Sequence, residues 1–220
     1  MCFSPIVSFL VFMLEVILAC YILTKNPKNS LNQLAAAIMA LLGFYQLSEF
    51  MLCISGNPLL WAKIGHLAYT FLPALSVSWV YCLIKSKKSQ LFYYALPAFF
   101  SALAILKSDF IASAQCMDCF ISIGYNWPWA WFWLYHIYYF GFILLAAIIL
   151  IKSIAKEKSK GRRNLYWIGL LGFLVFSLPA FLLLIVFRNL AIIFPSLYCE
   201  FALIFTIIAF FTIRQSERIK

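Results

Sequence analysis

Long apolar stretches alternate with short polar or basic segments along the whole chain. Seven of these stretches approach or exceed the roughly 20 mostly apolar residues that a helix needs to cross a bilayer. They cover approximately residues 4–23, 31–54, 61–84, 91–106, 129–151, 165–187 and 194–213. The pairs Asn26-Pro27 and Asn57-Pro58 interrupt the pattern as turn and helix-breaking signals. The pattern therefore predicts an all-α polytopic membrane protein with seven transmembrane helices.

The connections between these stretches are short, with one exception. Residues 107–128 are the long connection, and we expect them to form a loop. Pro73 lies inside the third stretch, where we expect a kink, and Pro97 lies inside the short fourth stretch. The first stretch has no basic start, so we expect a retained helix rather than a cleaved signal peptide. We expect residues 1–220 to form a single seven-helix transmembrane domain.

The basic residues are divided unevenly between alternate connections. Fourteen of the 17 Lys and Arg residues follow the first, third and fifth stretches or lie in the C-terminal tail. Only Lys63, Lys107 and Arg188 fall in the other connections. Because basic residues stay on the cytoplasmic side of a membrane, we expect the N-terminus outside and the C-terminus in the cytoplasm.

The composition also favours a membrane location. The chain is 65% hydrophobic, 19% aromatic and 11% charged, whereas soluble domains carry roughly 25% charged residues. The formal charge of +10 is clustered beside apolar stretches. Its expected counter-charge is therefore anionic lipid headgroups at the cytoplasmic side rather than nucleic acid. We expect a multi-pass protein of the bacterial inner membrane whose partner is the lipid bilayer, and no protein partner is indicated.

Five ionisable side chains lie within the predicted spans, where a charged group facing lipid costs roughly 2–3 kcal/mol or more. They are Glu15, Glu49, His66, His136 and Glu200. At about 1.5 Å per residue, all of them except Glu15 lie about 7–11 Å below the outer boundary. Glu15 lies near the middle of the first span. We therefore expect the other four to line one polar pocket that opens outward.

Helical spacing adds two polar groups to this layer, because Gln46 shares a face with Glu49 and Cys199 shares one with Glu200. The candidate ligand-binding residues are thus Gln46, Glu49, His66, His136, Cys199 and Glu200. The two histidines and two glutamates among them also form a candidate ligand set for zinc or another transition metal. Alternatively, these groups hydrogen-bond to one another and hold the helices together, as polar side chains do in membrane bundles.

Seven cysteines are present, and two of them form a Cys-x-x-Cys pair in the predicted outer loop. Oxidising conditions there favour a disulfide, so Cys116 and Cys119 are the disulfide candidates. Cys2 and Cys53 lie near the same surface, which leaves the connectivity open. A single Cys-x-x-Cys pair can also hold a metal or act in redox chemistry, and these alternatives remain.

Three short motifs carry a resemblance to a known family. The start Met1-Cys2-Phe3-Ser4 resembles that of an uncharacterised bacterial family of small seven-transmembrane-helix proteins, which begin Met-Cys-(Phe or Trp)-Ser. The segment Gln46-Leu47-Ser48-Glu49 is similar to the family's Gln-x-x-Glu in its second helix. The segment Ser196-Leu197-Tyr198-Cys199 is similar to its Ser-x-Trp-Cys in the last helix, with Tyr198 in place of Trp. The resemblance implies a seven-helix fold and points to Cys2, Gln46, Glu49 and Cys199, and it implies no activity.

Three functions are compatible with these residues. The first is a non-enzymatic binding or sensing bundle whose outward-facing pocket takes a small molecule or an ion. The second is a metal-dependent membrane enzyme of the hydrolase type, in which a carboxylate activates a metal-bound water. The third is a transporter or proton path that uses Glu15 beneath the outer pocket. An opsin is excluded, because residues 194–213 contain no lysine to form a retinal Schiff base.

Overall fold

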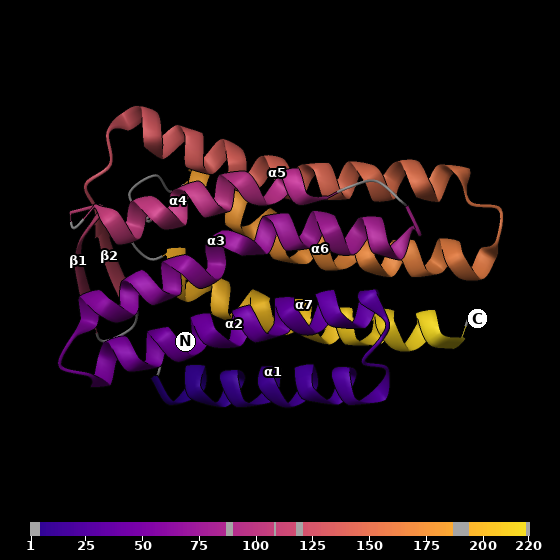
Figure 1. Cartoon of the computed structure of the whole chain (residues 1–220), viewed down its shortest axis with the longest axis horizontal. Helices are drawn as coiled ribbons and strands as arrows, with labels where there is room; N and C mark the ends of the chain where they lie inside the picture. Colours follow the sequence, from indigo (N-terminus) through magenta and orange to yellow (C-terminus); the bar gives the residue numbers. More distant parts are fainter. Residues whose placement is uncertain (1–4, 87–89, 108, 118–120, 187–193, 219–220) are drawn as a thin grey trace.

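The computed structural model describes residues 5–86, 90–107, 109–117, 121–186 and 194–218. Within these ranges, the side chains of residues 176, 179–186, 194–202 and 217–218 lie outside the description. Figure 1 shows an elongated bundle whose helices follow its long axis, with a small β-hairpin at one end. The helices are α1 (Pro5–Lys25), α2 (Ser30–Ile54), α3 (Pro58–Leu83), the 3-10 turn η1 (Leu91–Tyr94), α4 (Ala95–Leu106), α5 (Trp129–Lys156), α6 (Lys160–Val186) and α7 (Phe194–Arg218). The strands are β1 (Ile111–Cys116) and β2 (Ile121–Tyr125).

Over its described residues, each of the seven predicted apolar stretches is mostly helical. In the described part of the chain, four of these helices, α1, α2, α3 and α5, are long and apolar enough to cross a membrane. The expected helical character of a membrane protein is confirmed to that extent. Helix α3 continues through Pro73 without a break in its helical assignment.

Local sequence signals explain where the central helices begin. The side chain of Asn29 accepts a hydrogen bond from the backbone N–H of Leu31 (3.1 Å) at the start of α2. Asn57 does the same for Leu60 (3.2 Å) at the start of α3. Pro58 occupies the first turn of α3, where its missing N–H costs nothing. Side-chain acceptors of this kind satisfy backbone donors that have no partner within the helix.

The prediction that residues 107–128 form a loop is wrong for the two strands, which cover half of that segment. It contains an antiparallel hairpin in which Ala114 pairs with Ile123 and Cys116 with Ile121, with an irregularity between Ile111 and Ser113. Ile111 and Ile121 are fully buried, so the hairpin has an apolar face that packs on the bundle. This burial stabilises a two-stranded unit that would be marginal by itself.

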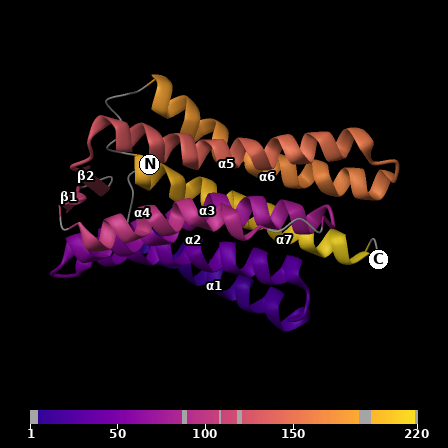
Figure 2. The same ribbon diagram turned by 45° about the horizontal axis from the view of Figure 1, so that its top comes forward.

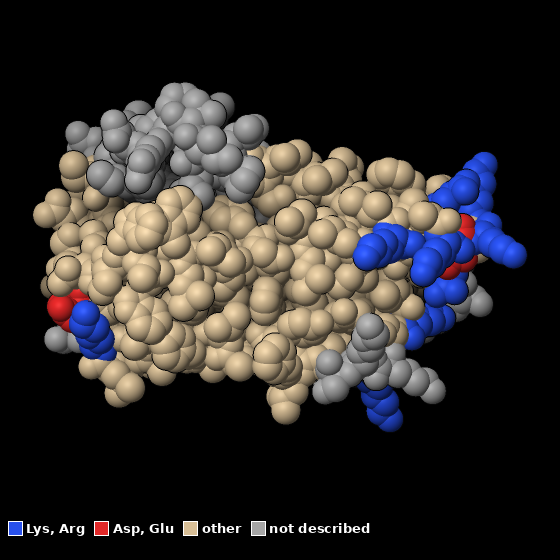
Figure 3. Space-filling view, turned by 90° about the horizontal axis from the view of Figure 1, so that it is seen from above, with Lys and Arg blue, Asp and Glu red and all other residues tan. Residues whose placement is uncertain are grey.

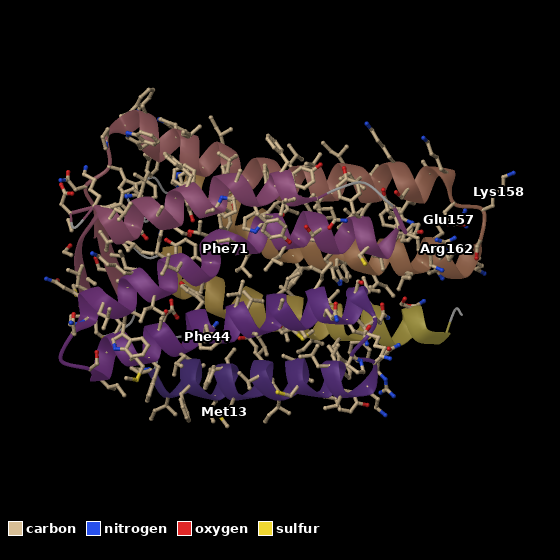
Figure 4. The ribbon with its side chains drawn as sticks, in the orientation of Figure 1. Met13, Phe44, Phe71, Glu157, Lys158 and Arg162 are labelled. Carbon is tan, nitrogen blue, oxygen red and sulfur yellow. A yellow bond between two sulfur atoms is a disulfide. The ribbon has the colours of Figure 1, made fainter. Side chains whose placement is uncertain are left out.

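Helices α2 and α3 form the centre of the bundle. Helix α2 packs against α1, α3 and α7, and α3 packs against α5, α4 and β1. Figures 1 and 2 both show α1 and α5 on opposite flanks of this centre. Helix α1 exposes apolar side chains such as Ile6, Leu10 and Ile17, and Figure 4 shows Met13 pointing away from the bundle. Exposed apolar stripes of this kind are expected of helices that face lipid.

The two ends of the bundle differ in charge. The hairpin lies at one end, which we call the hairpin end, together with the turn between α2 and α3. The turns between α1 and α2 and between α5 and α6 lie at the other end with the C-terminus, and we call it the basic end. Figure 3 shows Lys and Arg side chains gathered at the basic end, and few charged side chains at the hairpin end on this face. An ion pair at the hairpin end joins Lys107 and Asp109, whose charged atoms lie 3.7 Å apart.

Candidate functional site

His66 lies in a closed aromatic cage at the hairpin end. It is fully buried on α3, and its ring packs on Tyr69, Phe110, Tyr125, Trp127 and Tyr135, with centroid distances of 5.0 to 6.0 Å. Its Nδ1 atom hydrogen-bonds to the hydroxyl of Tyr69 (2.6 Å), which in turn bonds to the hydroxyl of Tyr125 (2.7 Å). Its Nε2 atom has no hydrogen-bond partner among the described residues.

The hairpin supplies one wall of this cage. The indole N–H of Trp127 donates to the backbone oxygen of Phe110 (3.0 Å), which fixes the connection from β2 to α5. Burial raises the pKa of Tyr125 to about 12, although its hydrogen bond with Tyr69 acts in the opposite direction. The Tyr125 hydroxyl therefore stays neutral at physiological pH. The cage is a hydrogen-bonded assembly of rings. Helical spacing in the sequence puts Tyr69 on the same face as His66, but no sequence signal indicated Phe110, Tyr125, Trp127 and Tyr135.

Glu49 lies in the same layer but outside this cage. It is 3% exposed, and its Oε1 atom accepts a hydrogen bond from the Tyr45 hydroxyl (2.6 Å) one helical turn earlier on α2. The ring of Tyr45 packs edge-on against Tyr69, with centroids 5.6 Å apart. Two tyrosine rings thus connect Glu49 with His66. The spacing of four residues between Tyr45 and Glu49 was visible in the sequence and could have indicated this pair.

His136 does not join the same cluster. It is half-buried, and its Nδ1 atom hydrogen-bonds to the backbone oxygen of Phe132 (2.7 Å) on its own helix. Its ring lies against Phe132 (4.0 Å) and Phe140 (6.3 Å). The nearest described link to His66 is Tyr135, whose ring contacts both histidines. His136 is therefore separated from His66 by an aromatic ring.

The candidate metal centre is not formed by its described members. Among the described residues, no group of three or more His, Cys, Asp or Glu side chains lies close enough to hold a metal ion. Glu49, His66 and His136 are instead held by separate hydrogen bonds with aromatic rings between them. The side chains of Cys199 and Glu200, the remaining predicted members of the layer, lie outside the described residues.

A second group of buried polar side chains lies between α1, α2 and α7. Ser8 and Glu15 face the bundle from α1, and Gln46 faces it from α2, each at most 1% exposed. The hydroxyl of Ser8, both amide atoms of Gln46 and the Oε2 atom of Glu15 have no hydrogen-bond partner in the described structure. These are four of the seven such atoms, so the unsatisfied polar groups concentrate in one interface.

The packing of α1 on α2 places these side chains in order along the bundle axis. The rings of Phe9 and Phe50 lie 5.0 Å apart, and the space beside Gly43 is bounded by Phe12 (3.4 Å) and by Glu15 (3.6 Å). Gln46, which lies between Gly43 and Phe50 on α2, is therefore at a level between Ser8 and Glu15. Ser8 and Glu15 are seven residues apart, or about 10 Å along the helix. We call Ser8, Gln46 and Glu15 the polar column.

The inner end of the polar column is closed by α7. The hydroxyl of Thr206 donates to Oε1 of Glu15 (3.2 Å), a contact that joins residues 191 positions apart. Thr206 is fully buried, and no sequence motif identified it. The sequence did predict that Glu15 avoids lipid and that Gln46 shares a face with Glu49, and all three side chains are buried.

A disulfide at the hairpin end corrects the expected pairing of Cys116. Cys116 is bonded to Cys53, with a Cα–Cα distance of 5.1 Å, and Cys119 lies outside the described residues. The bond connects the end of α2 to the end of β1. Cys20 and Cys82 are free thiols. The signal available in the sequence was only that Cys53 and Cys116 both lie near the same predicted membrane surface.

Comparisons with known proteins add no assignment to this geometry. No family model matches the chain, and no curated protein matches it either.

Proposed function

We propose that this protein is a multi-pass protein of the bacterial inner membrane that binds a small cationic ligand in the polar column. The seven helices cross the bilayer with the N-terminus and the hairpin outside and the basic end in the cytoplasm. The ligand enters from the outer half, and the protein acts as a binding or sensing bundle. The observation that carries the proposal is the set of four unpartnered polar atoms on Ser8, Gln46 and Glu15.

The energetic cost of these atoms is the first argument. A buried polar atom without a hydrogen bond costs about 1–3 kcal/mol. Four such atoms in one interface represent a destabilisation that a chain folding only for stability would remove with apolar side chains. A bound ligand that supplies their missing partners offsets this cost.

The chemistry of the atoms is the second argument. Serine hydroxyl, amide oxygen and carboxylate are oxygen ligands, which suit hard cations and ammonium groups. Among the described residues no Lys or Arg forms an ion pair with Glu15, whose hydrogen-bond partner is the neutral hydroxyl of Thr206. A charged carboxylate within a membrane span needs a counter-charge. A small cation, or an ammonium group with its three donors, provides it.

The charge distribution is the argument for orientation. The connections at the basic end carry Lys25, Lys28, Lys85 and the basic residues of the segment that begins at Lys152. The hairpin end carries Lys63 and Lys107 in the described part of the chain. Basic residues are retained on the cytoplasmic side, which puts the hairpin end outside. An oxidising exterior also suits the disulfide between Cys53 and Cys116.

The experiment is a thermal-unfolding titration of the purified full-length protein in detergent. At constant ionic strength, N-methylglucamine is exchanged for sodium, potassium, magnesium or methylammonium chloride. We expect at least one of these cations to raise the unfolding temperature in a saturable way, since a ligand at about 100 times its Kd stabilises by about 2.7 kcal/mol. If none of the four cations raises the unfolding temperature, the proposal is contradicted.

A variant at Gln46 makes the test specific. Gln46→Met replaces the unpartnered amide with an apolar side chain of similar length. We expect it to stabilise the cation-free protein and to abolish the response to cations. The control is Glu157→Gln, which removes a carboxylate far from the polar column. Glu157 lies in the turn between α5 and α6, 3.6 Å from Arg162 (Figure 4). If Gln46→Met retains the full response, the polar column is not the site.

A further inference from the structure

A small polar cavity opens between α1, α2 and α7 at the basic end. Its volume is about 80 Å³, and its apolar floor is formed by Ile22 and Ile213. Asn32 fixes the floor at the start of α2, because its amide nitrogen donates to the backbone oxygen of Ile22 (3.4 Å) and its amide oxygen accepts from Asn29 (3.0 Å). The cavity is separate from the polar column, which lies in the other half of the same interface.

Two cationic side chains stand at the rim of this cavity. Lys25 at the end of α1 lies over the ring of Tyr21 at 5.4 Å, and Arg214 on α7 lies over the ring of Phe210 at 5.9 Å. The two rings are in contact, with centroids 5.8 Å apart. Each ring positions its cation by a cation–π interaction and limits its freedom. The two charges are therefore held on either side of one opening.

The cations have no acidic partner in the described structure. The ion pairs there are Lys107 with Asp109 and Arg162 with Glu157, and both lie elsewhere. The cavity lining contains no Asp or Glu. Two like charges at the rim of one cavity repel one another, and an anion between them would remove that repulsion. The rim of the cavity is thus positively charged in the described structure.

The size and the donors favour a phosphate group. A cavity of about 80 Å³ exceeds the liquid volume of two water molecules at about 30 Å³ each, which is room for a tetrahedral PO₄ group. The planar guanidinium of Arg214 can donate two parallel hydrogen bonds to a phosphate, and the ammonium of Lys25 adds a third from the opposite side. We propose that this cavity binds the phosphate group of an anionic phospholipid.

The surroundings of the cavity favour a lipid over a soluble phosphate. Exposed apolar side chains continue from the rim along both helices, with Ile17 on α1 and with Ile207 and Phe211 on α7, exposed by 58%, 41% and 58% respectively. A lipid whose phosphate lies between Lys25 and Arg214 can lay its acyl chains along these residues. Basic pockets between transmembrane helices on the cytoplasmic side bind lipid headgroups in this way.

The test measures lipid retention by native mass spectrometry of the full-length protein in detergent. The protein is titrated with phosphatidylglycerol, with phosphatidylcholine and with inorganic phosphate. We expect preferential binding of phosphatidylglycerol and a roughly tenfold weaker affinity in the double variant Lys25→Gln/Arg214→Gln, since a tenfold change corresponds to about 1.4 kcal/mol, slightly less than one charge-assisted hydrogen bond. Arg214→Lys, which keeps the charge but loses the planar pair of donors, should lie between the two.

Two further variants distinguish lipid binding in the cavity from general electrostatic attraction to the basic end. Lys152→Gln/Lys158→Gln removes the same charge at the same end, away from the cavity, and should bind like the wild type. Ile213→Phe narrows the cavity at its floor without changing the charge, and should lose phosphatidylglycerol. Equal losses in both double variants would overturn the proposal in favour of diffuse attraction. Displacement of the lipid by inorganic phosphate, or equal binding of phosphatidylcholine, would overturn the assignment to an anionic lipid.

Discussion

The disulfide between Cys53 and Cys116 should contribute measurably to the free energy of unfolding. The bond closes a loop of 63 residues that contains α3, α4 and most of β1. Chain entropy assigns such a loop about 4 kcal/mol of stabilisation. Helices that stay inserted in the unfolded reference state reduce the entropy of the open loop, so this value is an upper limit. We expect Cys53→Ser/Cys116→Ser to lose about 2–4 kcal/mol.

The loss should concentrate at the hairpin end. Cys116 ends β1, and the hairpin contributes Phe110, Tyr125 and Trp127 to the cage around His66. Once the bond is broken, the hairpin is held to the bundle by this ring packing and by the hydrogen bond between Tyr69 and Tyr125 (2.7 Å). We therefore expect faster amide hydrogen exchange in the hairpin, while α1 and α2 keep their protection.

The assay is thermal unfolding in detergent with and without a reductant, combined with peptide mapping after alkylation. Reductant should lower the unfolding temperature of the wild type and leave the double variant unchanged. Cys20→Ser, which removes an exposed free thiol, is the control and should behave as the wild type. The reasoning is refuted if Cys53 is alkylated without prior reduction, if Cys116 is found joined to Cys119, or if the double variant is as stable as the wild type.

Three other predictions test the packing, the cage and the orientation. A Cβ at Gly65 would meet the hydroxyl of Ser48, so Gly65→Ala should destabilise by about 1–3 kcal/mol, and Ser48→Ala should restore much of that loss when unfolding of the double variant is measured. The raised pKa of Tyr125, about 12 against an ordinary 10.0, means that its contribution to stability is complete below pH 10 and is lost between pH 10 and 12. Unfolding in alkali should show this loss, and Tyr125→Phe should lack it. A membrane-impermeant maleimide should label Ser122→Cys on intact cells but Ser159→Cys only after permeabilisation, and the reverse pattern would show that the bundle is inserted the other way up.

The positions of the helices could be predicted because hydrocarbon imposes a length and a composition on each span. The Asn-Pro pairs then mark the ends, since Asn57 caps α3 and Pro58 occupies its first turn. The helix ends were less well predicted at the turn between α5 and α6. The helices extend to Lys156 and begin again at Lys160, because basic residues can continue a helix into water.

The hairpin and the disulfide were not predictable for a different reason. Each depends on contacts between residues that are distant in sequence, such as Ile111 and Ile121 buried against the bundle or Cys53 beside Cys116. Period-2 patterning over six residues is too short to be distinguished from a loop. The contact between Glu15 and Thr206 is of the same kind, because it needs the position of α7 relative to α1.

Of the predicted polar layer, Gln46, Glu49 and His66 are buried, His136 is half-buried, and the side chains of Cys199 and Glu200 lie outside the described residues. The rule that ionisable groups avoid lipid placed Glu15, Glu49 and His66 in the interior, where they lie. It assumed that these groups would meet one another. In the described structure they meet tyrosine and threonine hydroxyls instead, because a hydroxyl satisfies a carboxylate or an imidazole without the cost of burying a second charge.

The cage around His66 and the polar column differ in how well their polar groups are hydrogen-bonded. The cage around His66 is hydrogen-bonded and filled with rings, which makes it a rigid support with one unpartnered nitrogen. The polar column has little bonding beyond the contact of Glu15 with Thr206, and it lies beside α1, the helix that packs only along one edge of the bundle. The proposed cation would therefore displace few existing hydrogen bonds in the polar column.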